Sequence, residues 1–327
     1  MTTPARPPFD PELAAALTVI NEQVPPSITI EMVRHMRAEG LVDAPIFQAP
    51  DDLTLDGAFT EEAHEVPGPE GAPDVPVIVW RPTDASAPTG VLYWIHGGGM
   101  MIGSHRGAEI SGLLADAREL GMAVVSVDYR LAPEHPHPAP VEDCYAGLVW
   151  VAGNAEKLNI DPDRVVVGGG SAGGGLAAAT SLLARDRGGP RIAGQLLLCP
   201  MLDDRNDSVS AHQMAGVGVW DRTSNETGWT ALLGEGRGGP DVSPYAAPAR
   251  AEDLTGLPPA FLDVGSAETF RDEVVAYASA IWAAGGSAEL HVWPGGFHGF
   301  DGLLPQAALS MSATAQRPAW LRRVLGA

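Results

Sequence analysis

Apolar and polar residues alternate along most of the chain in blocks typical of strands and helices. Short runs rich in valine, isoleucine and leucine predict buried strands at 75–81, 91–96, 123–128, 165–168, 195–200, 260–264 and 288–293. Longer stretches between them predict helices near 107–120, 140–156, 172–187, 269–284 and 306–325. Nearly continuous apolar strands that alternate with helices indicate a parallel sheet covered on both faces, and this βαβ order starts near Thr60.

The first forty residues precede any strand of this pattern. Asp10 and Pro11 form a helix cap followed by a first-turn proline, and Gly40 ends the second of two short helices predicted within 11–40. Residues 44–57 are acidic and rich in turn-forming residues, which is typical of a linker. The helices contain no candidate catalytic residue, so we expect them to shape selectivity more than chemistry.

A second unusual segment, residues 203–240, separates two predicted strands by far more than a normal connection. We predict that it forms a cap together with the N-terminal helices, over the carboxyl ends of the strands, where open α/β sheets bind ligands. The expected division is a cap made of 1–45 and 203–240 on a catalytic domain made of 46–202 and 241–327.

The chain of 327 residues carries 20 basic and 41 acidic residues, a formal net charge of −21. Such a field repels phosphate backbones and anionic lipid surfaces, so nucleic acid and membranes are not expected partners. Cys144 and Cys199 lack the spacing of a metal or redox motif, and both are expected to be buried free thiols. No apolar run is long enough for a signal peptide or a membrane span, which predicts a cytoplasmic protein.

One motif joins a predicted strand directly to a predicted helix. Residues 169–173 read GGSAG and fit the G-x-S-x-G pattern, in which a tight turn presents a nucleophilic serine, here Ser171. The same stretch also fits the dinucleotide fingerprint G-x-G-x-x-G through residues 168–173. That alternative requires an acidic residue at the end of the next strand, but Asp186 falls within the predicted helix.

A second glycine-rich motif, HGGG at 96–99, follows the strand predicted at 91–96. Consecutive glycines let the backbone N–H groups of Gly97, Gly98 and Gly99 turn inward, where with Ala172 they can donate to the oxyanion of a tetrahedral intermediate. His96 itself is expected to brace this loop by hydrogen bonding.

Acyl transfer by serine requires a general base, and His298 follows the last predicted strand among glycines. In the chain order Ser, acid, His, the acid lies after the preceding strand. Four acidic residues occur there, and Glu268 is the one placed in the loop between strand and helix, although it could instead cap that helix. The other three are Asp263, Asp272 and Glu273. His135 and His137 form an HxH pair, but no zinc ligand set is completed.

Together these motifs resemble the hormone-sensitive-lipase-like branch of α/β hydrolases (bacterial family IV), which includes many bacterial carboxylesterases. The resemblance rests on HGGG at 96–99, DYRLAPEHPHPAP at 128–140, GGSAGG at 169–174, FRDE after Glu268 and FHGF at 297–300. Within this branch the chain is most similar to small-ester hydrolases that include a heroin-cleaving esterase. The resemblance implies a mostly parallel eight-stranded sheet with helices on both faces and a helical cap. It also implies oxyanion donors at Gly98, Gly99 and Ala172 and a homodimer through the last strand edge.

The chain departs from this family at two places. Glu268 stands where the family usually has an aspartate, commonly followed by proline, and Met100 and Met101 follow HGGG where an aromatic residue is usual. Met100, Met101, Trp220 and Phe300 are the candidates for an apolar substrate pocket.

The sequence therefore predicts a serine esterase for short- to medium-chain or aryl esters that needs no metal or cofactor and acts through an acyl-enzyme. An amidase or deacetylase on the same triad, and a ligand-binding protein of this fold without turnover, stay open as alternatives.

Overall fold

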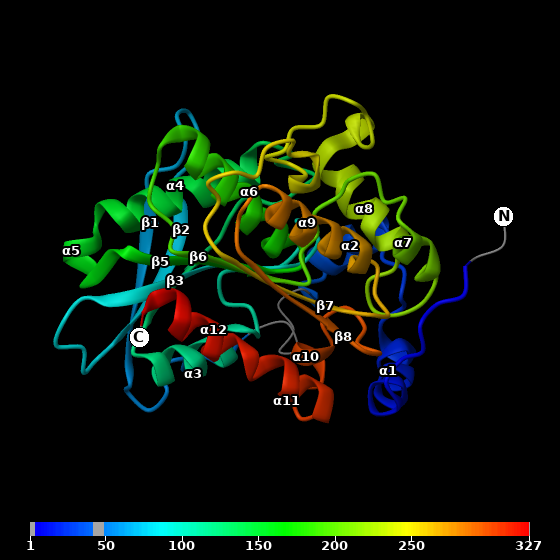
Figure 1. Ribbon diagram of the computed structural model, residues 1–327, viewed down its shortest axis with the longest axis horizontal. Helices are drawn as coiled ribbons and strands as arrows, with labels where there is room; N and C mark the ends of the chain where they lie inside the picture. Colours follow the sequence, from blue (N-terminus) through cyan, green and yellow to red (C-terminus); the bar gives the residue numbers. More distant parts are fainter. Residues whose placement is uncertain (1–3, 42–48, 327) are drawn as a thin grey trace.

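An eight-stranded sheet lies at the centre of the computed structural model, which describes residues 4–41 and 49–326 (Figure 1). The strands follow the order β1-β2-β4-β3-β5-β6-β7-β8. Their bounds are β1 Phe59–Val66, β2 Val75–Pro82, β3 Thr89–Ile95, β4 Ala123–Val127, β5 Ile160–Gly170, β6 Gly194–Leu198, β7 Ala260–Gly265 and β8 Ala288–Trp293. β2 is antiparallel to β1 and β4, and the pairs from β4 to β8 are parallel. The predicted mostly parallel, eight-stranded sheet is confirmed.

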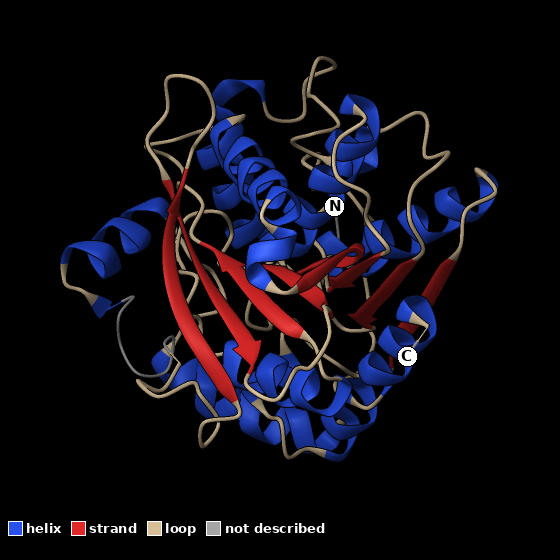
Figure 2. Ribbon diagram, turned by 90° about the vertical axis from the view of Figure 1, so that its left-hand side faces the viewer, coloured by secondary structure: helices blue, strands red, loops and turns tan. Residues whose placement is uncertain are grey.

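Helices cover both faces of this sheet (Figure 2). α4 (Ala139–Gly153), α6 (Ala172–Arg187) and α9 (Arg271–Ala283) pack on one face, and α3 (Ile110–Leu120) and α12 (Gln316–Leu325) on the other. The alternation within β3 shows why both layers are needed. Tyr93 and Ile95 belong to the core on the α4 and α6 side, whereas Leu92 and Trp94 belong to the core beside α3 and α12. Short helices elsewhere in the chain include α5 Ala155–Leu158, η3 Pro248–Arg250, α10 Phe300–Leu303 and α11 Ala308–Thr314.

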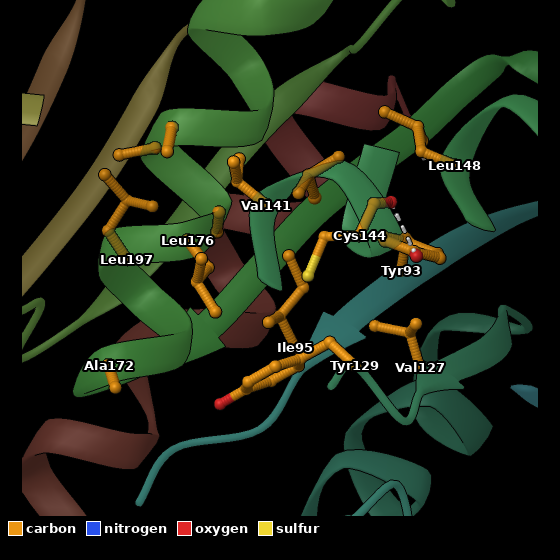
Figure 3. Close-up of a cluster of buried hydrophobic side chains, with 14 of the residues drawn as sticks. Tyr93, Ile95, Val127, Tyr129, Val141, Cys144, Leu148, Ala172, Leu176 and Leu197 are labelled. Atoms are coloured by element: carbon orange, nitrogen blue, oxygen red, sulfur yellow. Dashed lines mark hydrogen bonds between the residues drawn. The ribbon is translucent and has the colours of Figure 1, made fainter. Parts of the chain in front are cut away.

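The larger of these cores lies between α4, α6 and the strands (Figure 3). Cys144 is fully buried in it, and its backbone carbonyl accepts a hydrogen bond of 2.8 Å from the hydroxyl of Tyr93. Cys144 and Cys199 are both free thiols, as predicted, although Cys199 is partly exposed rather than buried.

Two elements differ from the sequence expectation. β1 is absent from the expected runs because this edge strand, FTEEAHEV, is mostly polar and only its terminal residues Phe59 and Val66 are buried. The helix expected at 306–325 is divided into α11 and α12. Pro318 lies in the first turn of α12 and has no N–H to continue the helical ladder from α11, so the break falls before it.

The two helices predicted at the N-terminus are present as α1 (Pro11–Gln23) and α2 (Ile30–Ala38). The Asp10 carboxylate caps α1 by accepting from the N–H groups of Glu12 and Leu13. Within the predicted linker, residues 44–48 lie outside the described residues, as do residues 1–3 and 42–45 of the predicted cap.

The long segment 203–240 contains α7 (Val209–Gln213), α8 (Arg222–Leu233) and η2 (Gly234–Gly236). The loop before α2 joins the start of α8: Ser27 Oγ donates to the Asp221 carboxylate at 2.8 Å, and the Ile28 N–H donates to Ser224 Oγ at 2.8 Å. Figure 1 shows α2, α7 and α8 grouped on one side of the molecule. Among the helices of the described residues, none has the length and apolar character needed to cross a membrane.

Candidate active site

Ser171 lies in the sharp turn between β5 and α6 and has a positive φ of 58°. Gly169 and Gly173 make this turn possible, because a Cβ added to Gly169 would lie 2.3 Å from the backbone of Gly173. The serine therefore stands at the carboxyl end of the sheet and at the start of α6. The dinucleotide alternative is not supported here: Asp186 lies on α6 and pairs with Arg185.

Two hydrogen bonds connect Ser171, His298 and Glu268. His298 Nε2 is 2.9 Å from Ser171 Oγ, and His298 Nδ1 is 2.9 Å from Glu268 Oε1. Glu268 is only 1% exposed, and its second oxygen accepts the N–H of Gly265 at 2.9 Å. The Phe270 ring meets the imidazole edge to face at 5.1 Å. These contacts fix both the orientation of the imidazole and the nitrogen that faces the serine.

The other acidic candidates have different partners. Asp272 accepts the N–H of Ser210 at 2.7 Å and pairs with Arg271, while Glu273 accepts the N–H of Leu202 at 2.7 Å. Burial raises the pKa of Glu273 well above its usual range. Glu268 thus stands alone among the four in contacting His298, and it does not cap α9, which has no side-chain cap.

Asp263 belongs to a buried ion cluster behind the site. Arg317 on α12 binds both Asp263 on β7, at 3.2 Å, and Asp301 on α10. Burial raises the pKa of Asp263 to about 6, whereas Arg317 keeps the pKa of Asp301 low against the opposing effect of burial. The cluster ties α12 to the helix that directly follows the His298 loop.

The HGGG loop approaches the serine turn closely, since a Cβ added to Gly97 would lie 2.9 Å from the carbonyl oxygen of Gly170. Gly98 and Gly99 have positive φ values of 103° and 62°. Within residues 4–41 and 49–326, the N–H groups of Gly98, Gly99 and Ala172 donate to no other backbone carbonyl. Three backbone donors are thus available beside the serine.

His96 lies at the start of this loop and is held in place by contacts with Tyr129. Its ring stacks on Tyr129 at 4.2 Å, and the Tyr129 hydroxyl donates to the His96 carbonyl at 3.0 Å. His96 Nδ1 is 2.8 Å from the Gly97 carbonyl oxygen. Burial lowers the pKa of His96 to about 4, so the imidazole is neutral at pH 7. A neutral, stacked ring suits the bracing role expected for it.

Ser171 and His298 open into a cavity of about 710 Å³. It extends between α3 and the segment from α10 to α12, and its lining combines apolar side chains such as Trp94, Ile102 and Leu113 with the carboxylate of Asp116. The predicted pocket residues Met100, Met101 and Phe300 do not line it, because all three are buried in core clusters. Nothing in the sequence around these three residues indicated that their side chains point into the core.

Trp220, the fourth pocket candidate, comes from the segment 203–240 and does reach the site. Its indole lies over Gly99, where a Cβ would be only 2.3 Å from the ring, and its centroid is 6.4 Å from that of His298. Trp220 also does not line the cavity. It instead covers the glycine loop.

The N-terminal helix contacts the loop that carries His298. The Asp10 N–H donates to the Gly295 carbonyl at 3.0 Å, and Phe9 meets Phe297 edge to face at 6.2 Å. Leu13 on α1 packs in the same cluster as Phe297. Nothing in the sequence indicated this contact, which ties the N-terminal segment to the loop of His298.

Within the described part of the chain, one group of three side chains could hold a metal ion: Cys199, Glu268 and His298. His135 and His137 belong to no such group there. Cys199 follows β6 directly and also lines the cavity, a placement that its position at the end of a parallel strand could have suggested.

The sheet order and the serine turn at its carboxyl edge define an α/β hydrolase. Residues 92–302 match the family model described as alpha/beta hydrolase fold, and the chain belongs to this family. The resemblance to its hormone-sensitive-lipase-like branch is confirmed by relatives of that kind.

Relatives match over almost the whole chain. Carboxylesterase NlhH of Mycobacterium tuberculosis is 34% identical over 100% of both chains, and esterase LipI of the same species is 35% identical over 94% of this chain and 93% of its own. Among solved structures, a bacterial heroin esterase superposes with a TM-score of 0.88 at 42% identity, covering 97% of this chain and 98% of its own.

Proposed function

We propose that this protein is a serine carboxylesterase in which Ser171 is the nucleophile, His298 the general base and Glu268 the residue that orients it. The observation that carries this proposal is the continuous chain of 2.9 Å hydrogen bonds from Glu268 through His298 to Ser171 at the wall of a cavity. The protein is a carboxylic ester hydrolase, as its esterase relatives are. A binding protein without turnover would have no need of this arrangement.

Acylation begins when Ser171 Oγ forms a bond to the acyl carbon and its proton passes to His298 Nε2. Negative charge develops on the former carbonyl oxygen and is stabilised by the N–H groups of Gly98, Gly99 and Ala172, with Gly97 shaping the loop. The start of α6 adds favourable electrostatic potential there. The ester C–O bond then breaks, and the leaving alcohol takes the proton from His298.

Deacylation repeats these steps with water. His298 accepts a proton from water as its oxygen bonds to the acyl carbon, and the proton passes to Ser171 Oγ when the acyl-enzyme bond breaks. Glu268 supports the imidazolium in both halves. The cycle consumes one ester and one water and yields a carboxylic acid and an alcohol.

The substrates proposed are short- to medium-chain or aryl esters. A cavity of about 710 Å³ lies in the range of small-molecule sites, and its apolar lining suits acyl chains and aromatic rings.

A panel of p-nitrophenyl esters from acetate to palmitate, run beside matched p-nitroanilides, tests both the activity and the substrate class. We expect hydrolysis of the short and medium esters, a fall for the longest chains, and little turnover of anilides. Anilides cleaved as fast as esters would indicate an amidase. A folded protein without turnover of any ester would refute the proposal.

We also propose that residues 1–45 and 203–240 form a cap on a catalytic domain of residues 46–202 and 241–327. The hydrogen bonds from Ser27 and Ile28 to the start of α8 support a joint cap, and the contact of the Trp220 indole with Gly99 supports a position of this cap over the glycine loop.

Two further properties are proposed. Within the described chain β8 pairs with β7 alone, so its free edge can pair with that of a second copy and form a homodimer. Two free thiols favour the reducing cytoplasm. Light scattering after gel filtration would test the dimer: a mass near twice 34.1 kDa is expected, and a mass of one chain would contradict it.

A further inference from the structure

Cys199 has a position that the proposed mechanism does not use. It is the first residue after β6, lines the cavity beside Ser171 and His298, and has a positive φ of 36°. Cys199, Glu268 and His298 each offer one potential ligand atom, and these three atoms lie within 4.8 Å of one another.

The geometry of these three atoms is close to that of a tetrahedral metal site. With Zn–S near 2.3 Å and Zn–N or Zn–O near 2.0 Å, neighbouring ligand atoms of a tetrahedral zinc are about 3.3 to 3.6 Å apart. Side-chain adjustments of up to roughly 1.5 Å would therefore bring the group to bonding distance. The open cavity provides an entry path and room for water as the fourth ligand.

The chemistry of the ligands selects the class of metal. A thiolate, an imidazole and a carboxylate suit Zn²⁺ and similar thiophilic divalent ions, whereas Mg²⁺ requires octahedral oxygen ligands. A divalent ion would also neutralise the combined charge of one thiolate and one buried carboxylate.

We propose that Cys199, Glu268 and His298 form an inhibitory binding site for Zn²⁺ and related thiophilic ions. Binding forms a bond from the metal to the Cys199 sulfur, whose proton is released to solvent, and bonds to His298 and Glu268. The metal is then bound to His298 and to the Glu268 carboxylate that orients it, so Ser171 cannot pass its proton to His298. The inhibition rests on the proposed roles of these residues in catalysis, but the binding itself does not.

Binding is tested without activity in the Ser171→Ala protein, titrated with Co²⁺ as a spectroscopic substitute for Zn²⁺. A thiolate-to-cobalt charge-transfer band is expected to saturate at one ion per chain. Adding Cys199→Ser should abolish the band. Adding Cys144→Ala should leave it unchanged, because Cys144 is buried in the core between α4 and the sheet (Figure 3).

Inhibition is tested in the otherwise unaltered enzyme, with each variant compared with its own metal-free rate. Half-inhibition of Cys199→Ser should require at least about tenfold more Zn²⁺ than the wild type, since even changes outside the ligand set cost ~10-fold or more in affinity. A chelator should restore activity, and Mg²⁺ should have no effect. Cys199→Gly, which suits the positive φ, replaces the serine variant if that variant does not fold.

Three outcomes would overturn this site: no cobalt band in the Ser171→Ala protein, a band that persists without Cys199, or equal zinc sensitivity of wild type and Cys199→Ser. Absence of ester hydrolysis in the metal-free wild type would instead refute the proposed function, and the cobalt titration would still decide the metal site.

Discussion

Replacing Glu268 with glutamine removes the charge that orients His298 and leaves the shape of the side chain nearly unchanged. In the native protein both oxygens accept hydrogen bonds at 2.9 Å, one with His298 Nδ1 and the other with the Gly265 N–H. A glutamine has only one oxygen. If that oxygen keeps the Gly265 bond, its NH₂ group faces Nδ1 and forces the imidazole proton onto Nε2, where it blocks acceptance from Ser171. If the amide flips, its NH₂ group faces the Gly265 N–H, and two donors oppose each other.

Either orientation therefore costs catalysis. Loss of the correct tautomer in a serine triad lowers kcat by about 10⁴, which corresponds to about 5.5 kcal/mol of transition-state stabilisation. Glu268→Asp keeps the charge but withdraws the oxygens by about 1.5 Å, one C–C bond length. A displacement of that size should lower kcat by about 10².

The assay is steady-state hydrolysis of a p-nitrophenyl ester, with circular dichroism and thermal melting to show that each variant is folded. Asp272→Asn is the control, because Asp272 binds Ser210 and Arg271 and does not contact His298. We expect it to keep kcat within a few fold of wild type. The assignment of Glu268 fails if folded Asp272→Asn loses as much kcat as Glu268→Gln.

Other predictions concern the nucleophile and two buried groups. An organophosphonate should add once to the wild type by intact-mass measurement and not at all to Ser171→Ala; an adduct on the variant would exclude Ser171. Burial holds the pKa of His96 at about 4, below the ~6.5 of an unfolded chain, so its contribution to stability is complete above pH 6.5 and is lost as pH falls toward 4. From pH 7 to pH 5, the free energy of unfolding measured by urea titration should fall by about 2 kcal/mol more in wild type than in His96→Asn. Equal falls in the two proteins would refute this contribution of His96. Arg317→Met should lower the free energy of unfolding by about 3 to 5 kcal/mol, because Asp263 and Asp301 stay buried without their cation; a change below about 1 kcal/mol by urea titration would show that the cluster contributes little.

The sequence predicted the position of those site residues whose place depends only on the order of the strands. Continuous apolar runs such as 123–128 marked buried strands, and the carboxyl ends of parallel strands meet at one edge, so residues after β5, β7 and β8 were expected together. The structure does bring Ser171, Glu268 and His298 into contact. Their catalytic roles remain predictions that the variants above test.

Side-chain orientation was not accessible in this way. Met100 and Met101 follow a motif that lines the site, yet both are buried in the core, and Met100 has a positive φ that its sequence does not announce. The ligand-like grouping of Cys199 with His298 depends on the packing of residues about a hundred positions apart. Periodicity describes only which face of its own element a residue occupies.

The contact of the N-terminal segment with the His298 loop constrains how molecules enter and leave. A segment held by the Asp10 to Gly295 hydrogen bond and by Phe9 on Phe297 cannot swing away as a lid without disturbing the loop that carries His298. Traffic of substrate and product is therefore expected through the part of the cavity that α3 lines, away from the N-terminal segment. A bulky tag fused just before Phe9 would act on turnover, while one at the opposite terminus would leave this support untouched.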